Sequence, residues 1–135
     1  MEPAALQALA DRQAIVDTVV RWASALDAKD WAAARSCFTD EVETDYGDLR
    51  GTGAERLSAD AFVELRRRAL EPLTSAMLIH RLDPARAADN TFDTLAHYTH
   101  TLVRTPHGWR ISRVRQAVAW NRGNAAIHSG AAGAR

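Results

Sequence analysis

The chain has 135 residues, no formal net charge, 47% hydrophobic and 25% charged residues. This length and balance predict a single globular domain, because domains cluster near ~100–150 residues. The neutral charge provides no overall field to attract nucleic acid or an anionic membrane. The single cysteine, Cys37, excludes an internal disulfide and a multi-cysteine metal site. No secretory signal and no apolar run of membrane-spanning length is visible, so we expect a cytoplasmic protein without membrane contact.

The first half of the sequence predicts three helices, near residues 5–28, 31–38 and 59–71. In the first helix, apolar residues at helical spacing form two neighbouring stripes: Ile15, Val19, Trp22 and Leu26, and beside them Val16, Val20 and Ala23. Asp27 continues the second stripe, so we expect its side chain to face the sheet rather than water. Asp30 caps the second helix, and Ser58 or Asp60 caps the third.

The third predicted helix has an apolar stripe that contains Phe62, Leu65 and Ala69, and Pro72 ends it. The arginine run at 66–68 indicates a solvated face of this helix.

Strands make up the rest of the prediction. The first begins near Glu41, with Val42, Thr44 and Tyr46 on one face, and a short return strand follows a turn at 47–48. Further strands are predicted at 74–82, 91–105 and 109–120, the last two joined by a turn at 106–108. This order predicts an α+β fold in which three N-terminal helices pack on a curved antiparallel sheet and enclose a cone-shaped cavity. We expect one domain over residues 1–124 and a mobile tail at 125–135.

Two segments resemble the SnoaL-like branch of the nuclear transport factor 2-like superfamily, which includes scytalone dehydratase and aromatic polyketide cyclases. They are RWASALDAKDWAAARSCFTDEVETDY, from Arg21 to Tyr46, and RTPHGWRISRVRQAVAWNRGN, from Arg104 to Asn124. The resemblance covers most of residues 11–124 and implies a cone-shaped α+β barrel. The sequence departs from scytalone dehydratase at Leu26, where that family has tyrosine, and at Met77, the counterpart of its catalytic histidine.

The resemblance implies a catalytic role for Asp27, because a carboxylate in an apolar cavity can exchange protons near neutral pH. It also implies that Tyr46 binds or polarises a substrate carbonyl. His80 and His97 are the candidate partners of Asp27. His97 and His100 lie on opposite faces of one predicted strand, so both cannot face the cavity without a bulge. The predicted substrate-binding residues are Trp22, Met77, Thr99, His100 and Trp120.

We therefore expect a cofactor-independent lyase or isomerase, of the dehydratase or cyclase type, acting on a small polyketide-like or cyclic carbonyl compound. The alternative is a non-catalytic module of the same fold that binds a small ligand or assembles with other chains. No metal-binding spacing such as H-x-x-x-H and no glycine-rich phosphate loop occurs, so neither a metal nor a cofactor is expected. Apolar residues predicted on the convex face of the sheet, Val114 and Val118, favour a homodimer or homotrimer.

Overall fold

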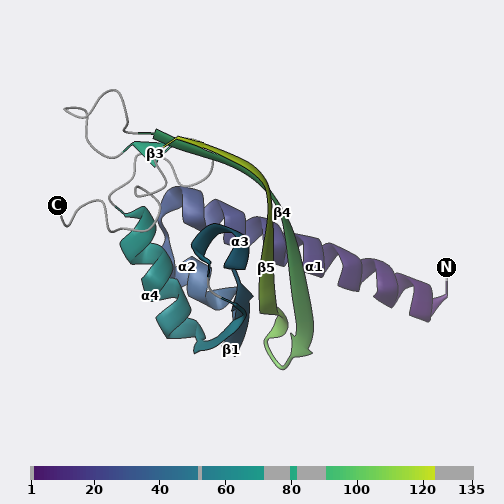
Figure 1. Cartoon of the computed structure of the whole chain (residues 1–135). Coiled ribbons are helices and arrows are strands. Elements are labelled where there is room, and N and C mark those ends of the chain that lie inside the picture. The colour runs from purple at the N-terminus through teal and green to yellow at the C-terminus, as the bar shows by residue number, and fades with distance from the viewer. Residues whose placement is uncertain (1, 52, 72–79, 82–90, 124–135) are drawn as a thin grey trace.

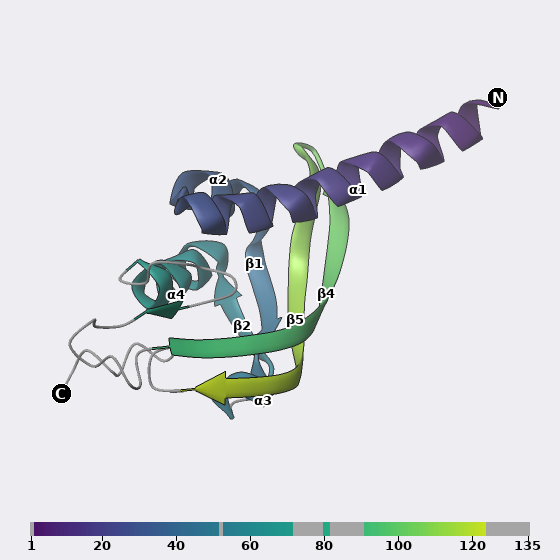
Figure 2. The same cartoon turned by 90° about the horizontal axis from the view of Figure 1, so that it is seen from above.

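The computed structural model describes residues 2–51, 53–71, 80–81 and 91–123. The elements are α1 (Pro3–Ala28), α2 (Trp31–Ser36), β1 (Phe38–Asp45), α3 (Gly47–Arg50), β2 (Glu55–Ser58), α4 (Ala59–Leu70), β3 (His80–Arg81), β4 (Thr91–Thr105) and β5 (Gly108–Gly123). The described strands form a five-stranded sheet in the order β2-β1-β5-β4-β3. Helices α1, α2 and α4 lie on one side of it, inside its curve (Figures 1 and 2). The predicted α+β class is confirmed.

Two of the predicted helix caps are present. The Asp30 carboxylate accepts a hydrogen bond from the Ala33 backbone N–H at 3.0 Å, and the Ser58 hydroxyl accepts one from Ala61 at 3.1 Å. Both side chains satisfy backbone donors that a helix start otherwise leaves without partners. Within the described residues, no helix is both long and apolar enough to cross a membrane.

The chain between the second and fourth helices differs from the prediction. Phe38 opens β1 instead of closing the second helix, and residues 47–50 form a helical turn instead of a return strand. The Asp45 carboxylate accepts a hydrogen bond from the Gly47 N–H at 3.1 Å, which favours a tight turn at this point. The Asp48 carboxylate accepts another from the Val118 N–H at 3.0 Å and ties this turn to β5. The strand that pairs with β1 is therefore β2.

The long C-terminal hairpin is confirmed. Strands β4 and β5 pair antiparallel from Thr105 opposite Gly108 to Phe92 opposite Gly123. Register shifts after Leu95 and after Thr101 bend the hairpin, because a bulge increases the local twist of a strand. Figure 2 shows that this bend carries the start of β4 and the end of β5 toward α4.

The sheet is mixed and not wholly antiparallel as predicted, because β1 and β5 run parallel. Of the expected strand at 74–82, the structure describes only β3, His80–Arg81, and the other residues lie outside the described part of the chain. Within β3, His80 pairs with Phe92 of β4.

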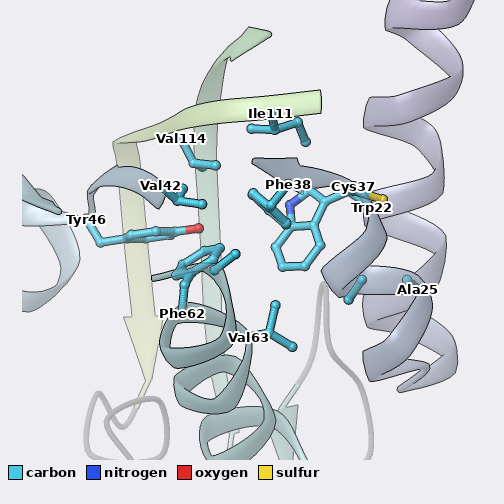
Figure 3. Close-up of a cluster of buried hydrophobic side chains, with 12 residues drawn as sticks. Trp22, Ala25, Cys37, Phe38, Val42, Tyr46, Phe62, Val63, Ile111 and Val114 are labelled. Atoms are coloured by element: carbon cyan, nitrogen blue, oxygen red, sulfur yellow. The ribbon is translucent and has the colours of Figure 1, made fainter. Parts of the chain in front are cut away.

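A cluster of three aromatic rings joins the helices to the sheet (Figure 3). Trp22 of α1 meets Phe38 of β1 edge-on with ring centroids 4.8 Å apart, and Phe38 meets Phe62 of α4 at 5.2 Å. Val42, Ile111 and Val114 of the sheet pack in the same buried cluster. Aromatic rings bury large areas and prefer such edge contacts, so this cluster fixes α1 and α4 against the sheet.

The outer face of the sheet is charged, which corrects the expectation for Val114. That residue is buried in the core, and the outer face instead carries ion pairs between neighbouring strands. They are Glu41 with Arg56 at 3.7 Å, Glu43 with Arg113 at 3.5 Å and Asp45 with Arg115 at 3.9 Å. The placement of Val114 on the outer face is thus wrong, and self-association stays a prediction from the sequence.

The aromatic cluster predicts opposite outcomes for two substitutions in α4. Phe62 is 2% exposed, so Phe62→Ala should lower the free energy of unfolding by about 3–5 kcal/mol, the usual loss for a large core side chain. Leu65 belongs to the predicted stripe but is 38% exposed, so Leu65→Ala should change stability by no more than about 0.5 kcal/mol. Urea unfolding followed by circular dichroism measures both. Similar losses for the two variants would show that the face of α4 is assigned incorrectly.

Candidate functional site

A cavity of about 320 Å³ lies between the helices and the concave face of the sheet. Its lining is mainly apolar with a few polar groups, and consists of Val19, Trp22, Ala23, Leu26, Tyr46, Arg66, Leu70, Thr94, Leu95, Ala96, Tyr98, His100 and Gln116. The lining residues come from α1, α4, the end of β1, and the paired strands β4 and β5. A cavity of this size and composition is typical of a small-molecule site.

Helix α1 faces the cavity with the first of its two predicted stripes. Val19, Trp22 and Leu26 line the cavity. Of the second stripe, Ala23 also lines it, whereas Val16 and Val20 are 48% and 56% exposed. Asp27 is exposed, so its expected orientation toward the sheet is wrong. The aromatic cluster centred on Trp22 sets the rotation of the helix, and a residue five positions later falls on another face. The predicted pair of Asp27 with a histidine is therefore not assembled in the described cavity.

The two histidines of β4 lie on opposite faces of the strand, as predicted. His100 lines the cavity, together with Tyr98 and Ala96 at alternate positions. His97 is exposed on the other face, and so is Thr99, so the assignment of these two residues to the cavity is wrong. The sequence pattern correctly allowed only one histidine inside but could not tell which.

His100 is a half-buried imidazole, and one of its ring nitrogens has no hydrogen-bond partner among the described residues. This nitrogen is the buried Nε2. The Tyr98 ring stacks on the imidazole with centroids 6.1 Å apart and planes inclined by 15°. Burial lowers the pKa of His100 below its ordinary value of 6.5, because desolvation penalises the charged form. At neutral pH the side chain is an uncharged base that faces the cavity.

Tyr46 lines the same cavity from the end of β1. Its side chain is buried in the core cluster, where Figure 3 shows the ring directed toward Phe62 and Val42. Burial raises the pKa of Tyr46 to about 12, and the nearby Arg66 opposes this shift only in part. The phenol therefore keeps its proton over the whole neutral range and remains a hydrogen-bond donor.

Four polar residues of the cavity were missed by the sequence analysis: Arg66, Thr94, Tyr98 and Gln116. The Gln116 amide donates to the Tyr98 hydroxyl at 2.7 Å and joins β5 to β4 inside the cavity. Arg66 was included in a solvated run, but only Arg67 and Arg68 are of that kind, and both bind Glu64. Arg66 is 5% exposed. Arg66 lies four residues after Phe62, about one helical turn along. This spacing could have indicated that the two side chains share the inward face of the helix.

Four of the five buried side-chain atoms without a partner in the described residues belong to this cavity. They are Nε and Nη2 of Arg66, Nε2 of His100 and Oε1 of Gln116. Buried polar groups are normally paired, so their concentration here indicates a place where a polar ligand completes the pairing.

The remaining predicted substrate-binding residues differ in position. Trp22 lines the cavity. Trp120 is 48% exposed and lies outside the cavity lining, opposite Leu95 in the hairpin register. Met77 lies outside the described residues, and of His80 the structure describes only its backbone pairing in β3. Across the part of the chain that the structure describes, no group of three or more His, Cys, Asp or Glu could hold a metal ion.

The low pKa of His100 predicts that acid weakens the fold through this residue. In the unfolded chain its pKa is near 6.5, and folding favours the neutral form, so the unfolded state binds more protons below that pH. This contribution to stability is complete above pH ~6.5 and is lost as the pH falls. Thermal unfolding should be followed between about pH 5 and 8. As the pH falls, the unfolding temperature of His100→Gln should decrease less than that of the wild type.

The matched control for this measurement is His97→Gln, which changes the exposed histidine on the outer face of the same strand. The unfolding temperature of this variant should change with pH in the same way as that of the wild type. Parallel curves for the wild type and His100→Gln would contradict the burial of the His100 imidazole.

Comparison with known proteins agrees with this architecture. A protein from Kribbella flavida, Kfla4162, superimposes with a TM-score of 0.78 at 20% identity over 90% of this chain and 98% of that one. The hexachlorocyclohexane dehydrochlorinase LinA-type3 of Novosphingobium barchaimii LL02 superimposes with a TM-score of 0.64 at 18% identity, over 91% of this chain and 96% of that one. An ntf2-like protein with a cystatin-like fold from Novosphingobium aromaticivorans superimposes with a TM-score of 0.59 at 18% identity, over 86% of each chain.

Structural neighbours at this level of identity establish the fold alone. No curated protein matches the chain. The model of the SnoaL-like domain matches residues 7–82, which include most of α1, Phe38 and Phe62 of the aromatic cluster, and Arg66. The chain therefore belongs to the SnoaL-like domain family.

Proposed function

We propose that this protein is a cofactor-independent lyase or isomerase, of the dehydratase or cyclase type, that acts on a small cyclic carbonyl compound. One observation carries the proposal: His100, with its lowered pKa and its unpartnered Nε2, lines an apolar cavity. Tyr46, a protonated phenol, lines the same cavity. Proton transfer at carbon needs a base of this kind together with a donor for the charge that develops on oxygen.

In the proposed reaction, Nε2 of His100 accepts a proton from the carbon next to the substrate carbonyl. The electron pair of the broken C–H bond forms the enolate, whose charge rests on the carbonyl oxygen. The Tyr46 hydroxyl donates a hydrogen bond to that oxygen. The imidazolium then returns the proton either to another carbon, which gives an isomer, or to a leaving hydroxyl, which gives water and a dehydrated product.

The fold comparison supports this class of reaction. The name of the LinA-type3 neighbour describes a dehydrochlorinase, and loss of hydrogen chloride, like loss of water, removes a proton from carbon and expels a leaving group. Asp27 and His97 have no part in the proposed step, because both side chains are exposed.

A non-catalytic ligand-binding or assembly module of the same fold is the second candidate. The exposed position of Asp27 favours it, since the acid–base pair implied by the family resemblance is not assembled in the described cavity. In this alternative the cavity binds a small molecule and His100 only contributes a hydrogen bond.

Exchange of carbon-bound protons separates the two candidates without knowledge of the natural substrate. β-Tetralone, a two-ring ketone, is incubated with the protein in deuterated water, and loss of its α-proton signals is followed by NMR. The wild type should accelerate the exchange, and His100→Gln should reduce the acceleration by about 10²-fold, the usual contribution of a general base.

The control is His97→Gln, which should exchange β-tetralone as fast as the wild type. Binding of β-tetralone without accelerated exchange would contradict the enzymatic proposal and favour the ligand-binding module. Equal acceleration by the wild type and His100→Gln would show that another residue is the base.

A further inference from the structure

Among the residues that the structure describes, the cavity contains a buried cation without an anionic partner. Arg66 is 5% exposed, and its side chain ends in a guanidinium cation with five N–H donors. No residue that lines the described cavity carries a carboxylate. Glu64, on the same helix, is held at the surface by Arg67 and Arg68 at 2.7 and 2.9 Å. Removal of a charge from water costs free energy, so an unpaired buried arginine needs a reason to persist.

The unpartnered atoms of Arg66 form one edge of its guanidinium. Nε and Nη2 are buried and have no hydrogen-bond partner among the described residues. Their N–H bonds point in the same direction, and this pair of parallel donors matches the two oxygens of a carboxylate. The flat face of the group is held by aromatic rings, with Cζ 4.7 Å from the centre of Tyr46 and 5.7 Å from that of Phe62. These contacts use the face of the group and not its donor edge.

We propose that Arg66 binds a carboxylate group of the ligand, so that the substrate class is a small cyclic carboxylic acid. The inference rests on the proposed function in taking this cavity as the substrate site. It adds the charge of the substrate and the residue that recognises it. Arg66 comes from the helix layer and His100 from the sheet, so a ligand anchored on Arg66 extends its ring among apolar walls where His100 also lies.

A carboxylate fits this environment better than a phosphate does. One guanidinium neutralises one negative charge, whereas a phosphate dianion needs further cations, and the described part of the cavity lining contains no other arginine or lysine. The apolar walls from Val19, Leu26 and Leu70 suit a hydrocarbon ring and would exclude a strongly hydrated ion.

The test compares two ligands of the same shape and different charge, 2-naphthoate and its neutral amide 2-naphthamide, by isothermal titration calorimetry at pH 7.5. The wild type should bind 2-naphthoate at least about tenfold more tightly than the amide, the effect of a charge-assisted hydrogen-bond pair. Arg66→Met should remove this preference and leave the affinity for 2-naphthamide within about twofold. Arg67→Met, which changes the exposed neighbour, should leave both affinities unchanged.

A second measurement uses the unfolding temperature. Without ligand, Arg66→Met should be at least as stable as the wild type, because it replaces an unpaired buried charge with an apolar chain. At the same concentration of 2-naphthoate, the wild type should gain more stability than Arg66→Met does. If Arg66→Met does not fold, Arg66→Lys tests the donor edge, because it keeps the charge and loses Nε and Nη2. It should bind 2-naphthoate more weakly than the wild type does.

Equal binding of the two ligands by the wild type would overturn the proposal, as would undiminished 2-naphthoate binding by the Arg66 variants. Absence of 2-naphthoate binding at millimolar concentration would overturn it as well. Neither ligand has a proton next to a ketone, so these results are independent of catalysis. Failure of the β-tetralone exchange alone would contradict the enzymatic function and leave the carboxylate site standing.

Discussion

The packing of Trp22, Phe38 and Phe62 is the constraint on which the site depends. These rings come from α1, β1 and α4, and their edge contacts fix both helices on the concave face of the sheet. The same contacts fix the rotation of each helix. With Trp22 inward, Val19 and Leu26 face the cavity and Asp27 faces water. With Phe62 inward, Arg66 follows it inward one turn later. The chemistry of the cavity is thus a consequence of how the aromatic core is packed.

The cavity combines apolar walls with polar groups that the described protein residues leave unpaired. Burial has different effects on these groups. It lowers the pKa of His100 and raises that of Tyr46 to about 12, so both are uncharged at neutral pH. The third group, Arg66, contributes a cation. A neutral base, a neutral donor and one fixed cation are the groups that recognise a carboxylate and move a proton at a neighbouring carbon.

Much of the fold could be predicted from the sequence because its signals are local. The caps at Asp30 and Ser58 and the turn that joins β4 to β5 depend on neighbouring residues and are confirmed. The site was harder to predict because it depends on helix rotation and strand register. Helix α1 has two neighbouring apolar stripes, and Asp27 was expected to face the sheet because it continues the second one. That stripe is mostly exposed, and so is Asp27. Three consecutive arginines also concealed that Arg66 shares the inward face of Phe62, although the spacing of four residues indicated it.

The central claim is that Arg66 and His100 act on one ligand in one cavity. A crystal structure of the protein with 2-naphthoate tests this most directly. The account predicts that the carboxylate lies against Nε and Nη2 of Arg66 and that the ring lies beside Trp22, in the cavity that His100 also lines. A carboxylate bound elsewhere, or an Arg66 side chain turned out to solvent, would contradict it.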